Sequence, residues 1–358
     1  MVTGVQTCAL PISKDGLADG SEALAGAIGL RGIEHYFYGP RLHEYLAEMR
    51  RESFGRYDAV TVGETAGLGM QMSKMLTAES RAELDMVFNF DALENPGKTR
   101  FDDYRYDLRY LKKYLLDWQQ NYGDNCWMSL FFENHDNPRM VSKVNPDPAV
   151  RAPLAKLLAT LQLTLKGTPF IYQGQELGLA NVDFASIDEI NDVESRNLYQ
   201  ELCGKMPSEE AWKRILAGTR DHARAPMPWN AGPNGGFTAG TPWLRMADGW
   251  QTCNAADEMR DPDSVFHYYK KLIALRRENP ALVYGAFRPV FLKTKRHADV
   301  FCYFRVLDGR KFYVECNLTA HQTPRPAPLS GAQAKRIGNY AEEAPVLRPY
   351  EANVYEVL

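Results

Sequence analysis

Short apolar segments alternate with amphipathic helical patterns from about residue 40 to residue 173, and this alternation restricts the fold more than any other feature. The helical patterns repeat leucine at three- and four-residue spacing, as in Leu154, Leu157, Leu158 and Leu161. Because each helix returns the chain to the edge of the sheet where the previous strand began, consecutive strands run parallel. Their apolar character indicates burial on both faces. The predicted strands are 57–62, 86–90, 127–132 and 169–172.

Polar residues follow each predicted strand. This placement fits the C-terminal rim of a (β/α) barrel, where active sites collect. A long excursion rich in Gly, Pro, Asn and Trp occupies about 174–260, and a helix is expected to begin near Asp263 or Ser264. From 283 to 358, short β-like runs separated by turns predict a small antiparallel β domain. The post-strand residues are Gly63-Glu64, Asn89-Phe90-Asp91, Glu133-Asn134-His135-Asp136 and Gln173-Gly174-Gln175-Glu176.

The composition excludes several classes of protein. Hydrophobic residues make up 45% and charged residues 24% of the 358, which is ordinary globular usage. A net charge of -3 without any arginine-rich block does not favour nucleic acid, and no apolar run approaches the length of a membrane span. Six cysteines without CxxC pairs suggest no zinc site, and no signal-peptide pattern is present. We therefore expect a cytoplasmic protein.

Glu64 and Asp136 are the strongest candidates for chemistry. Two carboxylates on a barrel rim suit acid/base work on a glycosidic bond, because one can deliver a proton while the other faces the developing positive charge. His135 and Arg139 lie beside Asp136 in the sequence. Taken singly, Glu64 could instead be a cap or surface residue, and His135 a residue that only completes a hydrogen bond. Both alternatives stay open at this point.

Three ordered motifs strengthen the catalytic interpretation. They are Val62-Gly63-Glu64-Thr65, the stretch 132–139 with Glu-Asn-His-Asp, and the stretch 167–178 with Gly-Thr-Pro-Phe-Ile-Tyr-Gln-Gly-Gln-Glu. With the stretches 220–229 and 236–243, they resemble the alpha-amylase superfamily of glycoside hydrolases, in its oligo-1,6-glucosidase, dextran glucosidase and alpha-glucosidase branch. The resemblance covers nearly all of 13–358. It implies an α/β fold in which 13–282 form the C-terminal half of a (β/α)8 TIM barrel, followed by the β domain of 283–358.

The resemblance also implies roles for individual residues. Glu64 matches the general acid/base. Asp136 matches the carboxylate that grips sugar hydroxyls and favours the positively charged transition state. His135 matches a hydroxyl-binding histidine, and Arg139 an arginine that fixes the non-reducing glucose, in the family by pairing with an acidic residue on an earlier strand. The aromatic candidates for sugar-stacking walls, with core packing as the alternative, are Phe90, Trp229, Phe237 and Trp243.

The N-terminal residues depart from the family pattern. Residues 1–12 look like the translation of a sequencing-library adapter. The family's nucleophilic aspartate comes a few residues before an Ile-Ser-Lys stretch, which this sequence reaches at Ile12-Ser13-Lys14, and no aspartate precedes Asp15. We therefore expect a fragment that lacks the nucleophile and is inactive. We expect no cofactor and no metal in this chain; a calcium site in a preceding N-terminal part stays open.

The expected activity of the parent is that of a retaining alpha-glucosidase acting on small alpha-linked gluco-oligosaccharides, as an oligo-1,6-glucosidase does. A trehalose-6-phosphate hydrolase or an alpha-1,4-glucosidase of the same family is the first alternative. The second is an inactive fragment or a sugar-binding or interaction relative. The expected partner is a small oligosaccharide, with no nucleic acid and no membrane. Linkage, chain length, phosphate recognition and oligomeric state stay open.

Overall fold

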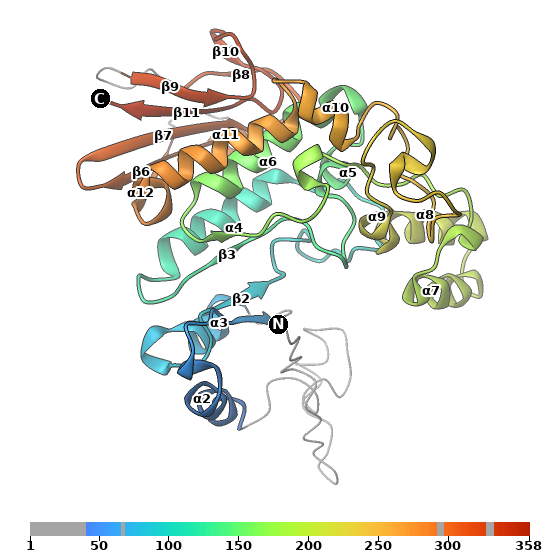
Figure 1. Cartoon of the computed structure of the whole chain (residues 1–358), viewed down its shortest axis with the longest axis horizontal. Coiled ribbons are helices and arrows are strands. Elements are labelled where there is room, and N and C mark those ends of the chain that lie inside the picture. Colours follow the sequence, from blue (N-terminus) through green and yellow to red (C-terminus); the bar gives the residue numbers. More distant parts are fainter. Residues whose placement is uncertain (1–40, 66–68, 292–296, 327–332) are drawn as a thin grey trace. The chain divides into compact units, whose positions relative to one another are not determined.

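The computed structural model describes residues 41–65, 69–291, 297–326 and 333–358, shown as coloured ribbon in Figure 1. It consists of two compact units. The first contains residues 1–91 and 117–129, and the second contains 92–116 and 130–358. The predicted adapter segment 1–12 and the Ile-Ser-Lys stretch lie outside the described residues.

The α-helices, 3-10 helices and strands have the following bounds, each type in chain order. The α-helices are α2 (Leu42–Glu52), α3 (Gly69–Thr77), α4 (Leu108–Asn121), α5 (Met140–Val144), α6 (Arg151–Thr164), α7 (Val193–Cys203), α8 (Ser208–Gly218), α9 (Asp221–Arg224), α10 (Ala255–Arg260), α11 (Val265–Glu278) and α12 (Pro280–Val283). The 3-10 helices are η3 (Phe54–Arg56), η4 (Glu79–Arg81), η5 (Pro148–Val150), η6 (Gln175–Leu177), η7 (Ile187–Glu189), η8 (Pro233–Gly236) and η9 (His297–Asp299). The strands are β1 (Val62–Thr65), β2 (Met86–Asn89), β3 (Ser129–Leu130), β4 (Thr168–Pro169), β5 (Ala286–Val290), β6 (Val300–Leu307), β7 (Arg310–Asn317), β8 (Thr323–Pro324), β9 (Gln333–Gly338), β10 (Val346–Leu347) and β11 (Ala352–Val357).

In the first unit, β1 and β2 pair in parallel, as the alternating pattern predicts. The strand predicted at 57–62 is wrong, because β1 begins only at Val62, and Tyr57 and Val60 are 75% and 74% exposed. The cause is local. Asp85 accepts hydrogen bonds from both the backbone N–H and the hydroxyl of Thr61 at 2.8 Å, which fixes the chain just before the strand. Glu64 therefore lies within β1 rather than after it.

Gly63 allows β1 to lie against the core of the first unit. That core is formed by Leu46, Leu76, Leu84 and Val87. A Cβ atom at Gly63 would come within 2.7 Å of Leu84 Cδ1 and 3.3 Å of Val87 Cγ1. Because successive side chains of a strand alternate, the buried position of Gly63 leaves Glu64 on the opposite, exposed face of β1.

The strands predicted at 127–132 and 169–172 are reduced to β3 and β4, which pair with each other. Within the described residues, the four predicted strands thus form two pairs, β1–β2 and β3–β4. Helix α11 lies along α6, as Figure 1 shows in orange and green. Its predicted start is confirmed, because Ser264 is the N-cap and its side chain accepts the N–H of His267.

The C-terminal part of the second unit is an antiparallel sheet in the order β5-β6-β7-β11-β9. This confirms the antiparallel β structure predicted for that part of the sequence. Two buried arginines, Arg276 of α11 and Arg305 of β6, bond to the end of α6. Arg276 Nη1 donates to Leu163 O at 3.0 Å, and Arg305 Nη1 donates to Thr164 O at 2.6 Å. Burial lowers the pKa of Arg276 to about 10 and that of Arg305 to about 9. The last carbonyls of a helix carry partial negative charge, which favours these guanidiniums.

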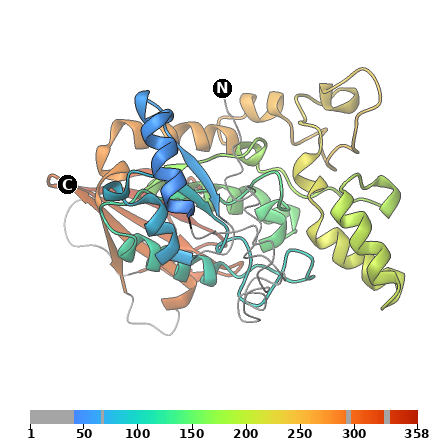
Figure 2. The ribbon, with the colours of Figure 1, turned by 90° about the horizontal axis from the view of Figure 1, so that it is seen from below.

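The excursion predicted at 174–260 contains helices of its own. Helices α7 and α8 lie side by side, as the yellow-green ribbons of Figure 2 show. Leu202, Ala211 and Ile215 form the buried core between them. The short helix α9 follows directly after α8 and carries His222, which is buried and bonded on both ring nitrogens.

Candidate active site

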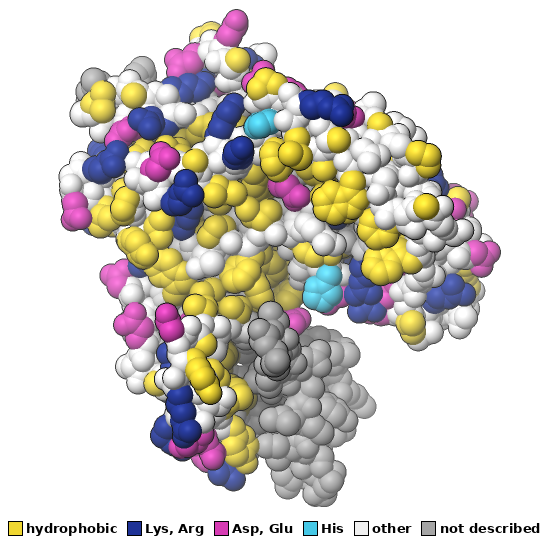
Figure 3. Space-filling view, in the orientation of Figure 1, with side chains coloured by type: hydrophobic (Ala, Val, Ile, Leu, Met, Phe, Trp, Pro, Cys, Tyr) yellow, Lys and Arg dark blue, Asp and Glu magenta, His cyan; other side chains and the backbone are white. Residues whose placement is uncertain are grey.

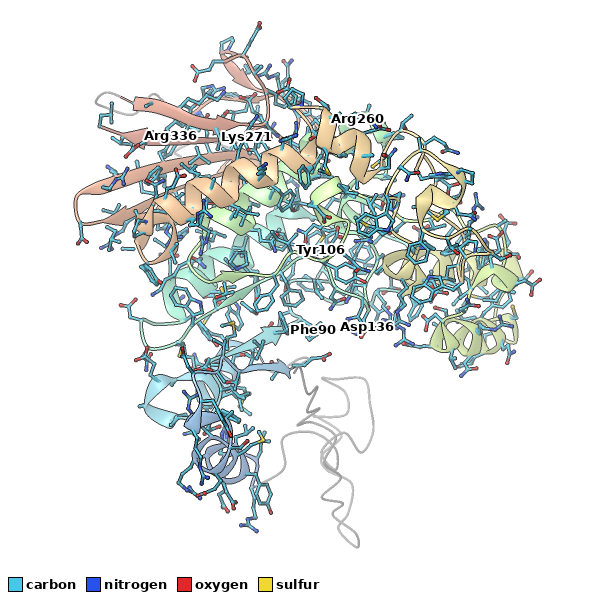
Figure 4. The ribbon with its side chains drawn as sticks, in the orientation of Figure 1. Phe90, Tyr106, Asp136, Arg260, Lys271 and Arg336 are labelled. Carbon is cyan, nitrogen blue, oxygen red and sulfur yellow. The ribbon has the colours of Figure 1, made fainter. Side chains whose placement is uncertain are left out.

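Asp136 is the centre of a cluster of charged side chains in the second unit (Figure 4). It lies in the turn after β3, where Asn134 Oδ1 accepts its N–H at 2.9 Å. Arg224 Nη2 donates to Asp136 Oδ1 at 2.6 Å, and Arg220 Nη1 lies 3.7 Å from the same oxygen. Arg100 Nη1 donates to the backbone oxygen of Asp136 at 2.7 Å. The Asp136 side chain is 31% exposed, so a ligand can reach it. We call these three arginines and Asp136 the Asp136 cluster.

Acidic residues hold the arginines of this cluster in place. Arg220 Nε donates to Asp192 Oδ1 at 2.9 Å, and Arg100 pairs with Glu194. Burial disfavours the charge of Asp192, but hydrogen bonds from Arg220 and Ser195 outweigh it and lower the pKa of Asp192. The hydrogen bond with Asp192 also raises the pKa of Arg220. The guanidiniums are therefore fixed before a ligand arrives, which reduces the entropy lost on binding.

His135 adds an exposed imidazole to the cluster. Its Nε2 lies 3.4 Å from Asp136 Oδ2, and its side chain is 64% exposed. Arg224 Nε donates to the backbone oxygen of His135 at 2.9 Å, so one guanidinium fixes two consecutive residues of the turn. The second carboxylate oxygen of Asp136 and the imidazole thus lie together on the accessible side, where both can bond to hydroxyl groups.

Arg139 is buried behind this turn. Its Nη1 donates to Glu133 Oε2 at 3.0 Å and to Gln173 O at 2.9 Å, and its guanidinium lies 5.1 Å from the centre of the Tyr172 ring. Burial raises the pKa of Glu133, against the opposing effect of Arg139. Among the described residues, Arg139 Nε has no hydrogen-bond partner. The acidic partner that the structure gives Arg139 is therefore Glu133, from its own loop.

Three of the predicted aromatic residues are exposed rather than packed in the core. Trp229, Phe237 and Trp243 expose 52%, 40% and 68% of their surface. Phe237 and Trp243 lie 6.3 Å apart, ring centre to ring centre. Trp243 Nε1 donates to Arg224 O at 3.1 Å, which connects this pair to the Asp136 cluster. Exposed rings beside polar groups suit the apolar faces of sugars.

Glu64 and Phe90 belong to the first unit. Glu64 is exposed on β1 and lies opposite Phe88 of β2 in the parallel register. Phe90, labelled in Figure 4, is half-buried directly after β2. Glu64 is thus accessible to solvent within its own unit, as a general acid must be to reach a substrate.

Arg100, Arg220 and Arg224 are not among the site residues predicted from the sequence. Arg220 and Arg224 are separated by four residues, a spacing that places two side chains on one face of a helix. This spacing in the sequence could have indicated that Arg220 and Arg224 lie together. Arg100 comes from a polar loop without periodic pattern, and nothing in its local sequence points to Asp136.

In the ranges 41–65, 69–291, 297–326 and 333–358, no group of three or more His, Cys, Asp and Glu side chains is arranged to hold a metal ion. In the same part of the chain, no helix is long and apolar enough to span a membrane.

A carboxylate among fixed guanidiniums, with an imidazole and exposed rings, has groups that suit a polyhydroxylated ligand. The similarity of the chain to known proteins agrees with a ligand of this kind. The family model described as alpha amylase, catalytic domain, matches residues 15–285, and the chain belongs to this family of glycoside hydrolases.

Individual relatives show which members of the family the chain is similar to. The chain is 39% identical, over 358 residues, to an oligo-1,6-glucosidase of Halalkalibacterium halodurans, covering 96% of this chain and 63% of that protein. The crystal structure of a trehalose-6-phosphate hydrolase of Bacillus licheniformis is similar with a TM-score of 0.82 and 36% identity, covering 91% of this chain and 61% of that one. An isomaltulose synthase structure from Klebsiella sp. LX3 gives a TM-score of 0.87 at 31% identity, covering 99% and 64%. The chain thus spans about three fifths of the length of the relatives it matches.

Proposed function

We propose that this chain is part of a retaining alpha-glucosidase that hydrolyses short alpha-linked gluco-oligosaccharides, with isomalto-oligosaccharides as the preferred substrates. In this proposal, residues 13–282 form the C-terminal half of a (β/α)8 barrel, 283–358 a C-terminal β domain, and 1–12 a segment of adapter origin. The observation that carries the proposal is the accessible Asp136, held by Arg224 at 2.6 Å, in a chain of the alpha-amylase family. The likeness to an oligo-1,6-glucosidase supports the choice of substrate.

The residues take distinct roles in this reaction. Glu64 donates a proton to the oxygen of the leaving sugar and later removes one from the attacking water. Asp136 accepts hydrogen bonds from ring hydroxyls and stabilises the oxocarbenium-like charge, while His135 binds a neighbouring hydroxyl. Arg139 fixes the position of the loop through Glu133, and Phe90, Trp229, Phe237 and Trp243 offer faces against which sugar rings stack.

A retaining mechanism also needs a carboxylate nucleophile about 5–5.5 Å from the acid/base. No aspartate precedes Asp15 in the sequence, where the family pattern requires one. We therefore propose that the 358-residue chain does not turn over substrate by itself, and that the activity belongs to a longer chain that supplies this aspartate.

The test uses two proteins. The chain as given should not release p-nitrophenol from p-nitrophenyl alpha-glucoside. A chain extended with the upstream sequence of its gene should hydrolyse isomaltose, and Glu64→Gln or Asp136→Asn should each lower kcat by about 10²–10⁴. Turnover by the short chain that Glu64→Gln abolishes would contradict the missing nucleophile. An extended chain with an intact aspartate that binds isomaltose without hydrolysing it would favour a sugar-binding relative.

A second candidate activity is hydrolysis of trehalose 6-phosphate. The likeness to the Bacillus licheniformis trehalose-6-phosphate hydrolase favours it. The same extended chain decides between the two, through kcat/KM measured in parallel for isomaltose and trehalose 6-phosphate. A higher value for isomaltose supports the proposal, and a higher value for the phosphorylated disaccharide replaces it.

A further inference from the structure

Tyr172 lies three residues after β4 and is close to two arginines of the second unit, Arg139 and Arg224. The centre of its ring lies 5.1 Å from the Arg139 guanidinium. Its hydroxyl donates to Ala223 O at 3.0 Å, and Arg224 is the residue after Ala223. Burial raises the pKa of Tyr172, and the charges of Arg139 and Arg224 both oppose this rise. One half-buried side chain therefore lies near both guanidiniums.

The hydroxyl of Tyr172 caps the C-terminal end of α9. A helix of four residues does not hold its own conformation, and the last carbonyls of a helix have no partner within it. In α9, Ala223 O accepts the Tyr172 hydroxyl, and Arg224 O accepts Trp243 Nε1 at 3.1 Å. The direction in which α9 ends thus depends in part on two aromatic side chains from other segments.

The end of α9 determines where the Arg224 guanidinium lies. Arg224 Nη2 donates to Asp136 Oδ1 at 2.6 Å, and Arg224 Nε donates to His135 O at 2.9 Å. Because a hydrogen bond weakens when its distance or direction changes, a displacement of the Ala223 carbonyl also affects Asp136. Tyr172 thus acts on the carboxylate of Asp136 through another residue.

The ring of Tyr172 also contacts the buried arginine of the Asp136 loop. Arg139 is 2% exposed, and an aromatic face attracts a guanidinium beside it. Arg139 Nη1 also donates to the carbonyl oxygen of Gln173, the residue after Tyr172, at 2.9 Å. A Cβ atom at Gly174 would come within 3.1 Å of Arg139 Nη2, so the turn packs directly against the guanidinium. Because Arg139 and Asp136 are three residues apart, this turn also fixes the loop that carries Asp136.

We propose that Tyr172 is a positioning residue, which holds Arg224 with its hydroxyl and Arg139 with its ring and thereby keeps Asp136 in place. The inference rests on the proposed function, because it concerns the charge that develops on the sugar during hydrolysis. Asp136 has its largest effect when that charge is present, in the transition state. A small displacement of Asp136 therefore lowers kcat and changes KM little.

The first test uses the extended chain with isomaltose as substrate. Tyr172→Phe removes the hydroxyl and keeps the ring, so kcat should fall about three- to tenfold, as expected for one lost hydrogen bond, with KM within about twofold. In an Arg224→Ala background the same change should have no further effect on kcat, because Tyr172 acts through Arg224. The matched control is Tyr268→Phe, which removes a buried hydroxyl 2.8 Å from Thr160 Oγ1 and should leave kcat unchanged.

Three results of this test would each overturn the proposal. They are a kcat for Tyr172→Phe equal to that for Tyr268→Phe, an equal loss of kcat with and without Arg224, and a change confined to KM.

The second test uses the 358-residue chain and needs no hydrolysis. Tyr172→Phe and Arg224→Ala should each lower the urea concentration at the midpoint of unfolding. The double variant should lower it by less than the sum of the two shifts, because both changes break the same connection. Additive shifts would overturn the proposal. Non-additive shifts, together with an extended chain that does not hydrolyse isomaltose, would contradict the glucosidase assignment and still support the connection between Tyr172 and Arg224.

Discussion

At the scale of single residues, the site combines accessible and buried charges that depend on each other. Asp136 is open to solvent on one side and bonded to Arg224 on the other, whereas Arg139 and Glu133 are both nearly completely buried. Glu133 Oε1 also accepts the backbone N–H of Met140 at 3.0 Å. One buried carboxylate thus fixes both a guanidinium and the start of α5, which directly follows the turn of Asp136.

The buried pair Glu133–Arg139 should be essential for stability. Glu133→Ala leaves Arg139 charged and unpaired in the interior, and the loss of one partner of a buried pair costs about 3–5 kcal/mol. The free energy of unfolding, measured by urea denaturation, should fall by this amount. Glu209→Ala is the control, because its pair with Lys213 is exposed and contributes about 0.5 kcal/mol or less. A loss at Glu133 as small as that of the control would contradict the prediction.

His222 should make the stability depend on pH. Burial lowers its pKa from 6.5 to about 4, with Arg139 acting in the same direction. Between these values the unfolded chain binds a proton that the folded one does not, so the free energy of unfolding decreases as the pH falls through this window. The loss amounts to about 3 kcal/mol in total. Above pH 6.5 the group has no effect.

His222→Gln is the test, because glutamine can accept from Val182 N–H and donate to Leu216 O as the imidazole does, without titrating. The slope of unfolding free energy against pH between 6.5 and 4 should become smaller in this variant. His321→Gln, at an exposed position, should leave it as in the wild type. Equal slopes for wild type and His222→Gln would show that another group controls the acid stability.

At the scale of elements, α8 ends against the loop that carries Arg100. Gly218 is the last residue of α8, and a Cβ atom there would come within 2.6 Å of both Arg100 O and Phe101 Cδ1. The absence of a side chain therefore lets the excursion approach the loop at 100–101. Helix α8, although distant in the sequence, thus helps to position Arg100. The guanidinium of Arg100 bonds to the backbone oxygen of Asp136.

Gly218→Ala should disturb this contact. The added methyl group meets the backbone of Arg100 as well as the ring of Phe101, so the loop must move, at a cost of about 1–3 kcal/mol. The free energy of unfolding should decrease accordingly. Gly240→Ala is the control, because the atom nearest to a methyl group added there is Thr238 Oγ1, at 3.8 Å. If both variants unfold at the same denaturant concentration, the close contact at Gly218 has no energetic role.

The elements differ in how well the sequence predicts them. Strand β2, helices α2, α6 and α11 and the antiparallel C-terminal strands follow from apolar periodicity, which depends only on neighbouring residues. The start of β1 does not, because Asp85, 24 residues away, fixes Thr61. Arg224 and Asp136 meet although 88 residues separate them, and no local pattern contains that information. Such contacts are set by tertiary packing alone.

At the scale of the whole molecule, apolar surface is distributed over both units. In the first unit Tyr57 and Val60 are largely exposed, and in the second unit Tyr284 and Phe291 are each 63% exposed. Figure 3 shows hydrophobic side chains gathered along and below α11 on the visible face of the second unit. Among the described residues, β1 pairs only with β2. Exposed apolar patches and unpaired strand edges both favour association between copies.

We therefore expect the 358-residue chain to self-associate. In sedimentation velocity, the mean sedimentation coefficient should increase with protein concentration. Tyr57→Ser with Val60→Ser should reduce this increase, because it removes two exposed apolar side chains just before β1. Lys205→Ser with Lys213→Ser, at two exposed charged positions on the excursion, is the control and should not reduce it. A single monomeric species at every concentration, with a sharp thermal transition, would mean that the apolar surface is too dispersed to bind a second copy.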